Sequence, residues 1–159
     1  MTSQSRLSKG PRATAPESSA LKLWVVLAKA QQALYRHAEA DVARHGLSMM
    51  EFAILEALYH KGPLLLGDLQ RRILVSSGGV TYLVDRLTAK DLVERIDCAT
   101  DRRARYAALT DAGEALIARI FPEHQQAIEK ATAALTPREQ DALSAQLRTL
   151  GRHIESITE

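Results

Sequence analysis

The sequence predicts a mainly α fold with one small β-hairpin, and three observations lead to this prediction. Apolar residues recur at steps of three and four over most of the chain, which is the period of an amphipathic helix. Two S/T-x-x-E boxes mark the starts of helices. One short stretch near the centre alternates apolar and polar residues, as half-buried strands do.

The composition is that of an ordinary globular domain. Hydrophobic residues make up 46% and charged residues 25% of the 159 residues, while aromatic residues make up only 4%, so the core should be aliphatic. No apolar run approaches the length of a membrane span. The single cysteine, Cys98, excludes an internal disulfide and fits a reducing compartment, so we expect a cytoplasmic protein.

The chain should hold a tail and one domain. Residues 1–19 are rich in Ser, Thr, Pro, Ala and Gly and lack an apolar period, which predicts a disordered tail. Residues 20–159 should form a single domain. Its first helix spans residues 21–45, and Gly46 should end that helix as a left-handed cap.

A compact lobe is expected over residues 48–109. Ser48 and Glu51 form a capping box that starts one helix, and Gly62-Pro63 ends it. A short helix over residues 66–73, a turn over 74–76 and a second helix over 77–90 follow. Two strands, 92–96 and 105–109, then flank a polar loop over 97–104. This order of helix, turn, helix and hairpin predicts a winged helix-turn-helix.

The C-terminal part should be two helices. Thr110 caps the first, and Pro122 within it should kink it. Thr136-Pro137 combines a capping box with proline at the first helical position, which starts the second. The apolar steps of this last helix are those of a coiled-coil seam: Leu143, Leu147, Leu150, Ile154 and Ile157. We therefore expect residues 21–45 and 110–157 to be dimerisation helices.

Adjacent glycines open the second helix of the helix-turn-helix, where each costs about 0.5–1 kcal/mol relative to alanine. A helix that enters the major groove accepts this cost because its backbone approaches the bases and phosphates closely. A tight helix–helix crossing would also need glycine, and the two interpretations remain open. The expected DNA contacts from this segment are Ser76, Ser77, Gly78, Gly79, Thr81, Tyr82 and Arg86.

The hairpin tip favours the DNA interpretation. Asp101, Arg102 and Arg103, with Arg105 nearby, lie where a narrow loop can enter a minor groove, whose negative potential attracts arginine. A solvated charged turn is the plainer alternative. Residues 68–110 carry eight basic and six acidic residues, whereas residues 111–159 carry five basic and eight acidic ones. A phosphate-facing surface needs only such a local basic excess.

The sequence resembles the MarR (multiple antibiotic resistance regulator) family over about residues 21–157. The resemblance rests on LSMMEFAILEAL, on LLGDLQRRILVSSGGVTYLVDRLTAKDLVER and on DRRARYAALTDAGEAL. The last holds the family's wing signature, here Asp101, Arg103, Leu109 and Thr110. The resemblance implies a head-to-tail dimer with Arg103 in the minor groove and residues 76–86 in the major groove. It also implies a repressor controlled by a small molecule or an oxidant.

Within the family, the sequence most resembles members that respond to aromatic compounds such as quinones. The family's ligand pocket makes Trp24, His37 and Met50 the pocket candidates, although Trp24 packing in a dimer core is the favoured alternative. Oxidation-sensing relatives carry a reactive cysteine in the first long helix, and this chain has none there. Cys98 is interpreted as an incidental cysteine of a polar loop.

No enzyme signature, metal-ligand spacing or cofactor motif is found, so we expect neither catalysis, a metal nor a cofactor. The sequence predicts a homodimeric DNA-binding regulator that reads an inverted-repeat operator and is released by a small aromatic, phenolic or quinone-like ligand. Two alternatives are a helical dimeric interaction module without DNA activity and an anti-repressor that titrates another regulator. An interaction module would not need three charged residues at a hairpin tip.

Overall fold

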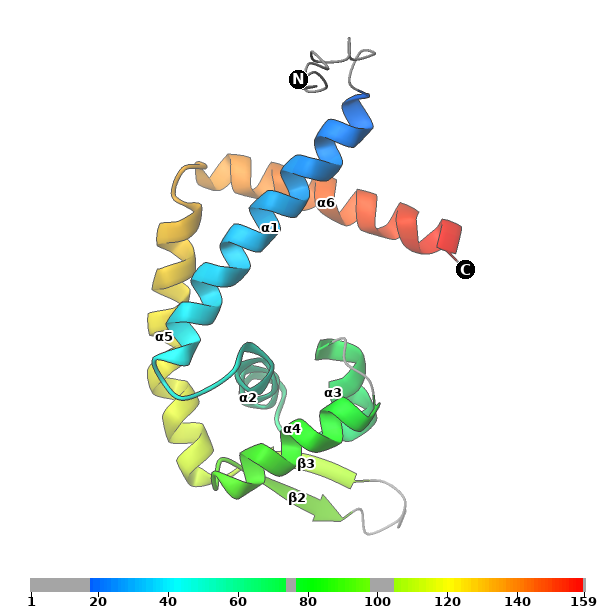
Figure 1. Ribbon diagram of the computed structural model, residues 1–159. Coiled ribbons are helices and arrows are strands. Elements are labelled where there is room, and N and C mark those ends of the chain that lie inside the picture. Colours follow the sequence, from blue (N-terminus) through cyan, green and yellow to red (C-terminus); the bar gives the residue numbers. More distant parts are fainter. Residues whose placement is uncertain (1–17, 74–76, 98–104, 159) are drawn as a thin grey trace, which may run out of the picture. The chain divides into compact units, whose positions relative to one another are not determined.

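The computed structural model describes residues 18–73, 77–97 and 105–158 (Figure 1). The chain divides into two compact units, Met1–Ala33 and Leu34–Glu159, and the first is described from residue 18 onward. Most of the predicted disordered tail therefore lies outside the described residues. The elements in chain order are α1 (Ser19–Ala43), α2 (Met49–Lys61), β1 (Leu64–Leu65), α3 (Leu66–Ile73), α4 (Ser77–Ala89), β2 (Val93–Asp97), β3 (Arg105–Leu109), α5 (Asp111–Thr132) and α6 (Pro137–Thr158).

The three strands form one antiparallel sheet in the order β1-β3-β2. Strands β2 and β3 make the predicted hairpin, with Val93 opposite Leu109. The sequence does not predict β1, which pairs with the other edge of β3 and places Leu64 opposite Ala107. Two residues are too few to show an alternating pattern, so this strand had no sequence signal. The mainly α fold with a small winged sheet is confirmed.

The hydrophobic core lies in the lobe built by α2, α3, α4, the sheet and the first half of α5. It is aliphatic apart from one phenylalanine, as the composition predicts. Its largest fully buried apolar side chains are Phe52, Ile54, Leu55, Leu69, Leu87, Ile117 and Ile120. At roughly 25 cal/mol per Å² of apolar surface removed from water, such side chains supply most of the favourable free energy that holds the lobe together.

The predicted helix caps are confirmed. The backbone N–H of Glu51 donates to the Ser48 hydroxyl (3.2 Å), and the Glu51 carboxylate accepts from the Ser48 N–H (2.8 Å). Thr136 and Glu139 make the same reciprocal pair at the start of α6. Gly46 has φ +72°, the left-handed conformation predicted for it. These bonds satisfy backbone groups that helix ends leave without intrahelical partners.

The start of α5 packs very closely on the backbone before it. Thr110 caps the helix by accepting from the Gly113 N–H (3.0 Å), and α5 then continues through Pro122 as one helix. A Cβ added at Gly113 would lie 1.9 Å from the carbonyl oxygen of Leu92. Only glycine therefore fits there, and this close approach links α5 to the start of the hairpin.

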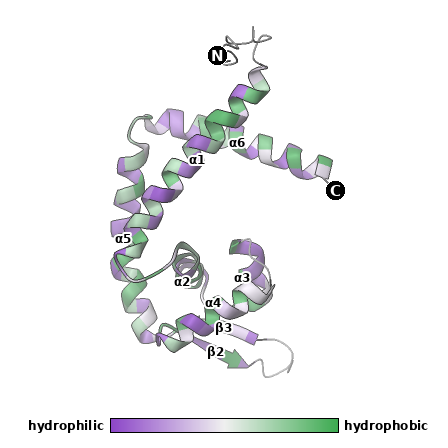
Figure 2. Ribbon diagram, in the orientation of Figure 1, coloured by the Kyte–Doolittle hydropathy of each residue, from purple (hydrophilic) through white to green (hydrophobic). Residues whose placement is uncertain are grey.

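Two helices, α1 and α6, carry hydrophobic residues along their length (Figure 2), and many of these residues are exposed. No described residue of α6 is buried, and Leu147 and Ile154 of its predicted seam are 38% and 49% exposed. In the other unit, Trp24 is 68% exposed on α1. Within the described part of the chain, no helix is long and apolar enough to cross a membrane. Exposed apolar surface of this extent is typical of helices that bind a partner.

Candidate nucleic-acid interface

Helix α4 has one face in the core and one face outward. Val80, Val84 and Leu87 are buried at the spacing of one helix face, which anchors α4 against the lobe. The opposite face is exposed and carries Gly78, Thr81, Tyr82, Asp85 and Arg86. If the lobe is a helix-turn-helix, as the sequence predicts, this outward face should contact DNA. Ser77 is the first residue of α4, and Ser76 lies outside the described residues.

The structure separates the two interpretations of the glycine pair at one position. A Cβ added at Gly78 would meet nothing within 4 Å, so no helix crossing among the described residues needs a glycine there. Gly79 is half-buried beside it. The open space at Gly78 leaves the outward face of the first turn accessible to an external partner.

A buried carboxylate holds the C-terminal end of α4 on the start of α2. Glu51 is fully buried, and its Oε1 lies 2.9 Å from Lys90 Nζ and 3.3 Å from Arg86 Nε. We call these three residues the Glu51 cluster. Lys90 also donates to the Gly46 carbonyl oxygen (3.0 Å), and so reaches the loop between α1 and α2. The sequence indicated Glu51 only as a capping residue, because nothing in a linear pattern marks a contact 39 residues away.

The charge state of the cluster follows from its contacts. Burial alone would raise the pKa of Glu51, but the Ser48 backbone N–H and the Lys90 ammonium donate hydrogen bonds to the carboxylate. The positive charges of Lys90 and Arg86 add to this, and together they hold the pKa of Glu51 below its usual value. The carboxylate is therefore ionised at neutral pH, and Arg86 is drawn toward it from the outward face.

The wing is fastened to the same helix by an arginine. Arg95 on β2 places Nη2 2.8 Å from Asp85 Oδ1 and 3.4 Å from the carbonyl oxygen of Thr81, both on α4. One guanidinium thus bridges two successive turns of α4, and it fixes the hairpin against the helix. Nothing in the sequence indicates this contact, because an arginine on a short strand is an ordinary solvent-facing residue.

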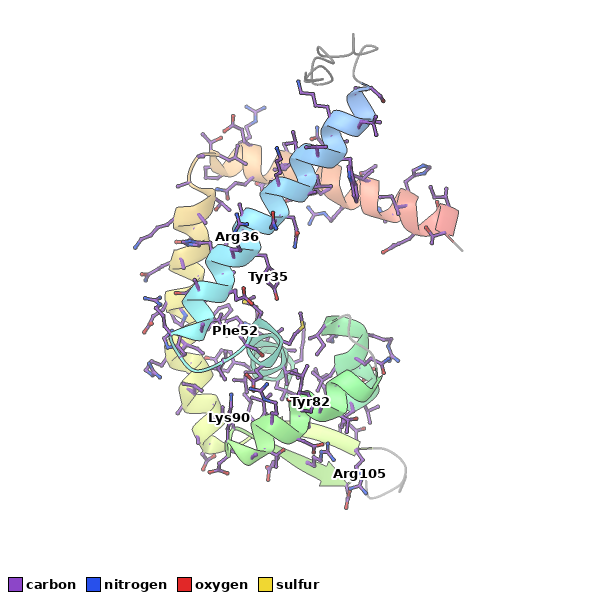
Figure 3. The ribbon with its side chains drawn as sticks, viewed as in Figure 1. Tyr35, Arg36, Phe52, Tyr82, Lys90 and Arg105 are labelled. Atoms are coloured by element: carbon purple, nitrogen blue, oxygen red, sulfur yellow. The ribbon has the colours of Figure 1, made fainter. Side chains whose placement is uncertain are left out.

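The predicted tip of the wing, residues 101–103, lies outside the described residues, so its role stays a prediction. Arg105 is described at the start of β3, where its Nη1 lies 2.6 Å from Asp97 Oδ1 across the hairpin. Figure 3 labels Arg105 at the loop end of the hairpin, Tyr82 on α4 and Lys90 just after the C-terminal end of α4. Arg105 therefore has a structural partner that the sequence pattern did not indicate.

Tyr82 is the largest side chain of the outward face. It is 59% exposed, and the Arg86 guanidinium carbon lies 5.8 Å from the centre of its ring. This is the distance of a cation–π contact. Arg86, which the sequence predicted as a DNA contact, thus lies between an exposed aromatic ring and a buried carboxylate.

The three pocket candidates lie in different surroundings. His37 lines a groove of about 500 Å³ between α1 and α5, and its Nε2 lies 3.2 Å from the Ala127 carbonyl oxygen. Met50 instead packs against the hydrophobic core. Trp24 belongs to the other compact unit. A shared pocket for all three stays a prediction, and His37 alone among them lines this groove.

A network that the sequence did not predict lies beside this groove and includes two of its lining residues, Asp41 and Arg44. Asp41 is buried, its Oδ2 lies 2.9 Å from His124 Nδ1, and its Oδ1 contacts Arg44. The His124 ring also contacts Phe52, with ring centres 4.6 Å apart. Burial raises the pKa of Asp41, but the contacts with His124 and Arg44 outweigh it and hold the pKa below its usual value. The contacts among Asp41 of α1, His124 of α5 and Phe52 of α2 thus connect these three helices.

Among the residues that the structure describes, no group of three or more His, Cys, Asp or Glu side chains is arranged to hold a metal ion. Cys98 lies outside them.

Comparisons with known proteins agree with this geometry. A model of the MarR family matches residues 45–104. The HTH-type transcriptional regulator MhqR of Bacillus subtilis is 38% identical over 131 residues, which cover 82% of this chain and 90% of MhqR.

Two solved structures share the fold. Sco3205, a MarR family transcriptional regulator from Streptomyces coelicolor solved in complex with DNA, is 25% identical with a TM-score of 0.80, covering 92% of each chain. BpsR of Bordetella bronchiseptica, whose DNA binding is regulated by 6-hydroxynicotinic acid, is 25% identical with a TM-score of 0.74. That match covers 82% of this chain and 98% of BpsR.

Proposed function

This chain belongs to the MarR family of transcription regulators, and on that premise we propose that it is a repressor that binds a palindromic operator as a homodimer. We further propose that a small aromatic, phenolic or quinone-like ligand releases it. The observation that carries the proposal is the outward face of α4, which is anchored by a buried apolar face, held by the Glu51 cluster and fastened to the wing by Arg95. Such a rigid helix beside a hairpin suits the major groove with the wing in the neighbouring minor groove.

The DNA contacts divide between two grooves in this proposal. The first two turns of α4 meet base edges and phosphates, where the open space beside Gly78 permits close approach. Arg103 at the wing tip enters the minor groove, where narrow A·T-rich segments attract arginine. The relative Sco3205 was solved in complex with DNA, which supports this mode of binding.

Dimerisation is proposed to use the apolar side chains that the two terminal helices expose. α6 offers Leu143, Leu147 and Ile154, and α1 offers Trp24 and Val26, all more than a third exposed. A second copy would cover them, and obligate interfaces of this kind bury about 2,000 Å² or more. A two-fold dimer then presents two α4 helices to half-sites about 10 bp apart, which requires an inverted repeat.

The effector is proposed to change the spacing between the two DNA-binding lobes of the dimer, one from each protomer. BpsR is regulated by 6-hydroxynicotinic acid, a hydroxylated aromatic acid, which supports an effector of this class. His37 and Arg44 offer polar groups to such a ligand in the groove between α1 and α5. Ligand-to-DNA coupling in regulators is typically about 1–3 kcal/mol.

Selection of bound duplexes from a random DNA pool tests the proposal. We expect enrichment of an inverted repeat whose half-sites lie about 10 bp apart, protected symmetrically in a footprint. Repetition with 6-hydroxynicotinic acid and with simple phenols and quinones then tests release. Failure to enrich any sequence, or protection of a single half-site, would contradict the proposal.

A further inference from the structure

We infer that Tyr82 reads an operator base by packing its ring on the methyl group of a thymine in the major groove, and that Arg86 positions this ring. The inference rests on the proposed function and names one determinant of its sequence preference. It also changes the role of Arg86, which the sequence predicted as a direct DNA contact.

Arg86 is held away from base reading by its partners. Its Nε lies 3.3 Å from the fully buried Glu51 carboxylate, which has Lys90 as its other cation. Turning Arg86 out to a guanine would leave that carboxylate with Lys90 alone, and removing a partner from a buried charge is costly. The Arg86 guanidinium therefore stays beside the Tyr82 ring, 5.8 Å from its centre, and restricts the orientations of the ring.

The neighbours of Tyr82 on the outward face are small or already engaged. One turn earlier lies Gly78, beside which a Cβ would have open space. One turn later, Asp85 is bound by Arg95, and this neutralises a carboxylate that would otherwise repel phosphates. Tyr82 is 59% exposed, and on the described part of this face it is thus the large side chain best placed to contact bases in a DNA groove.

The chemistry of the ring selects thymine. Among the groups displayed in the major groove, the thymine C5-methyl is the apolar one, and apolar side chains contact it. Burying one methyl group contributes about as much as one CH₂, which corresponds to roughly a fourfold gain in affinity per contact. Arginine and lysine instead prefer guanine. Base reading by Tyr82 therefore predicts a thymine in the operator, whereas base reading by Arg86 predicts a guanine.

Substitution of deoxyuridine for thymine, one position at a time in the selected operator, tests the inference because it removes only the methyl group. We expect the wild-type chain to lose about fourfold in affinity at one thymine of each half-site. Tyr82→Ala should show no loss at that position, whereas Tyr82→Phe should retain it. Tyr59→Ala is the matched control, since it removes another exposed tyrosine, on α2, and should keep the full uracil effect.

The role of Arg86 has its own readout. Arg86→Gln should weaken the uracil effect at the same thymine, because the ring is no longer held, while circular dichroism shows a folded chain. An equal uracil effect in the wild type and in Tyr82→Ala would overturn the inference while leaving DNA binding intact. A wild-type chain that binds no duplex above background would overturn the proposed function and this inference together.

Discussion

Replacing Glu51 with glutamine tests whether the Glu51 cluster holds α4 in place. The glutamine amide oxygen can still accept the Ser48 N–H, so the cap survives and mainly the charge is lost. Hydrogen bonds to charged groups contribute about 1.5–3 kcal/mol. Breaking a buried ion pair costs about 3–5 kcal/mol, but Arg86 and Lys90 are 45% and 33% exposed and recover hydration. We therefore expect a loss of about 2–3 kcal/mol at pH 7.

The pH dependence gives this prediction a sign. The pKa of Glu51 is lowered in the folded state from its usual value of 4.5. A carboxyl with a lowered folded pKa adds stability above its unfolded pKa, and this stability is lost as the pH falls through the folded pKa. The stability difference between wild type and Glu51→Gln should therefore be full at pH 7 and shrink progressively below about pH 4.5.

Urea unfolding at equal protomer concentration, from pH 7 down to pH 3, measures the difference, because the stability of a dimer depends on concentration. Glu56→Gln, the same change on the same helix at a half-buried glutamate outside the Glu51 cluster, is the control and should cost less than about 0.5 kcal/mol. The Glu51 carboxylate does not stabilise the fold in this way if Glu51→Gln is as stable as that control at pH 7, or if its loss of stability relative to wild type is the same at pH 7 and pH 3.

Three further predictions concern packing, assembly and release. Gly113→Ala should destabilise the chain by at least about 1–3 kcal/mol in thermal unfolding, because its Cβ would overlap the Leu92 backbone, whereas Gly67→Ala meets nothing closer than 4.0 Å and should be tolerated. Leu147→Glu combined with Leu150→Glu should give monomers in analytical ultracentrifugation that no longer bind operator; a folded, DNA-binding monomer would contradict the assembly. An aromatic effector should change the fluorescence of the single tryptophan and weaken operator binding about 5- to 150-fold. If oxidants weaken operator binding and no aromatic compound does, this mode of release is excluded.

The sequence predicted the local architecture well because local rules determine it. The capping boxes at Ser48 and Thr136 and the left-handed turn at Gly46 depend on neighbours within four residues, and all three are as predicted. The two hairpin strands and the helices on both sides of the turn also follow from periodicity. The boundaries differ by one or two residues, as helix and strand ends commonly do.

What the sequence could not predict depends on contacts between distant residues. Lys90 meets Glu51 across 39 residues, and His124 meets Asp41 across 83. Neither pair has a linear signature, and an exposed arginine such as Arg86 looks the same in sequence whether it faces DNA or a buried acid. Arg103 and the rest of the wing tip remain sequence predictions.

We propose that this chain reads a specific duplex through α4 and the wing. The most direct test is the dissociation constant, measured against salt concentration, for the selected operator and a scrambled duplex of equal length, with wild type and Arg103→Ala. We expect wild type to prefer the operator by at least about a thousandfold at physiological salt. Arg103→Ala should weaken binding to both duplexes and flatten the salt dependence by about one unit of slope. Equal wild-type affinity for the two duplexes would contradict sequence-specific binding, and an Arg103→Ala variant with unchanged affinity and slope would contradict a DNA contact by the wing.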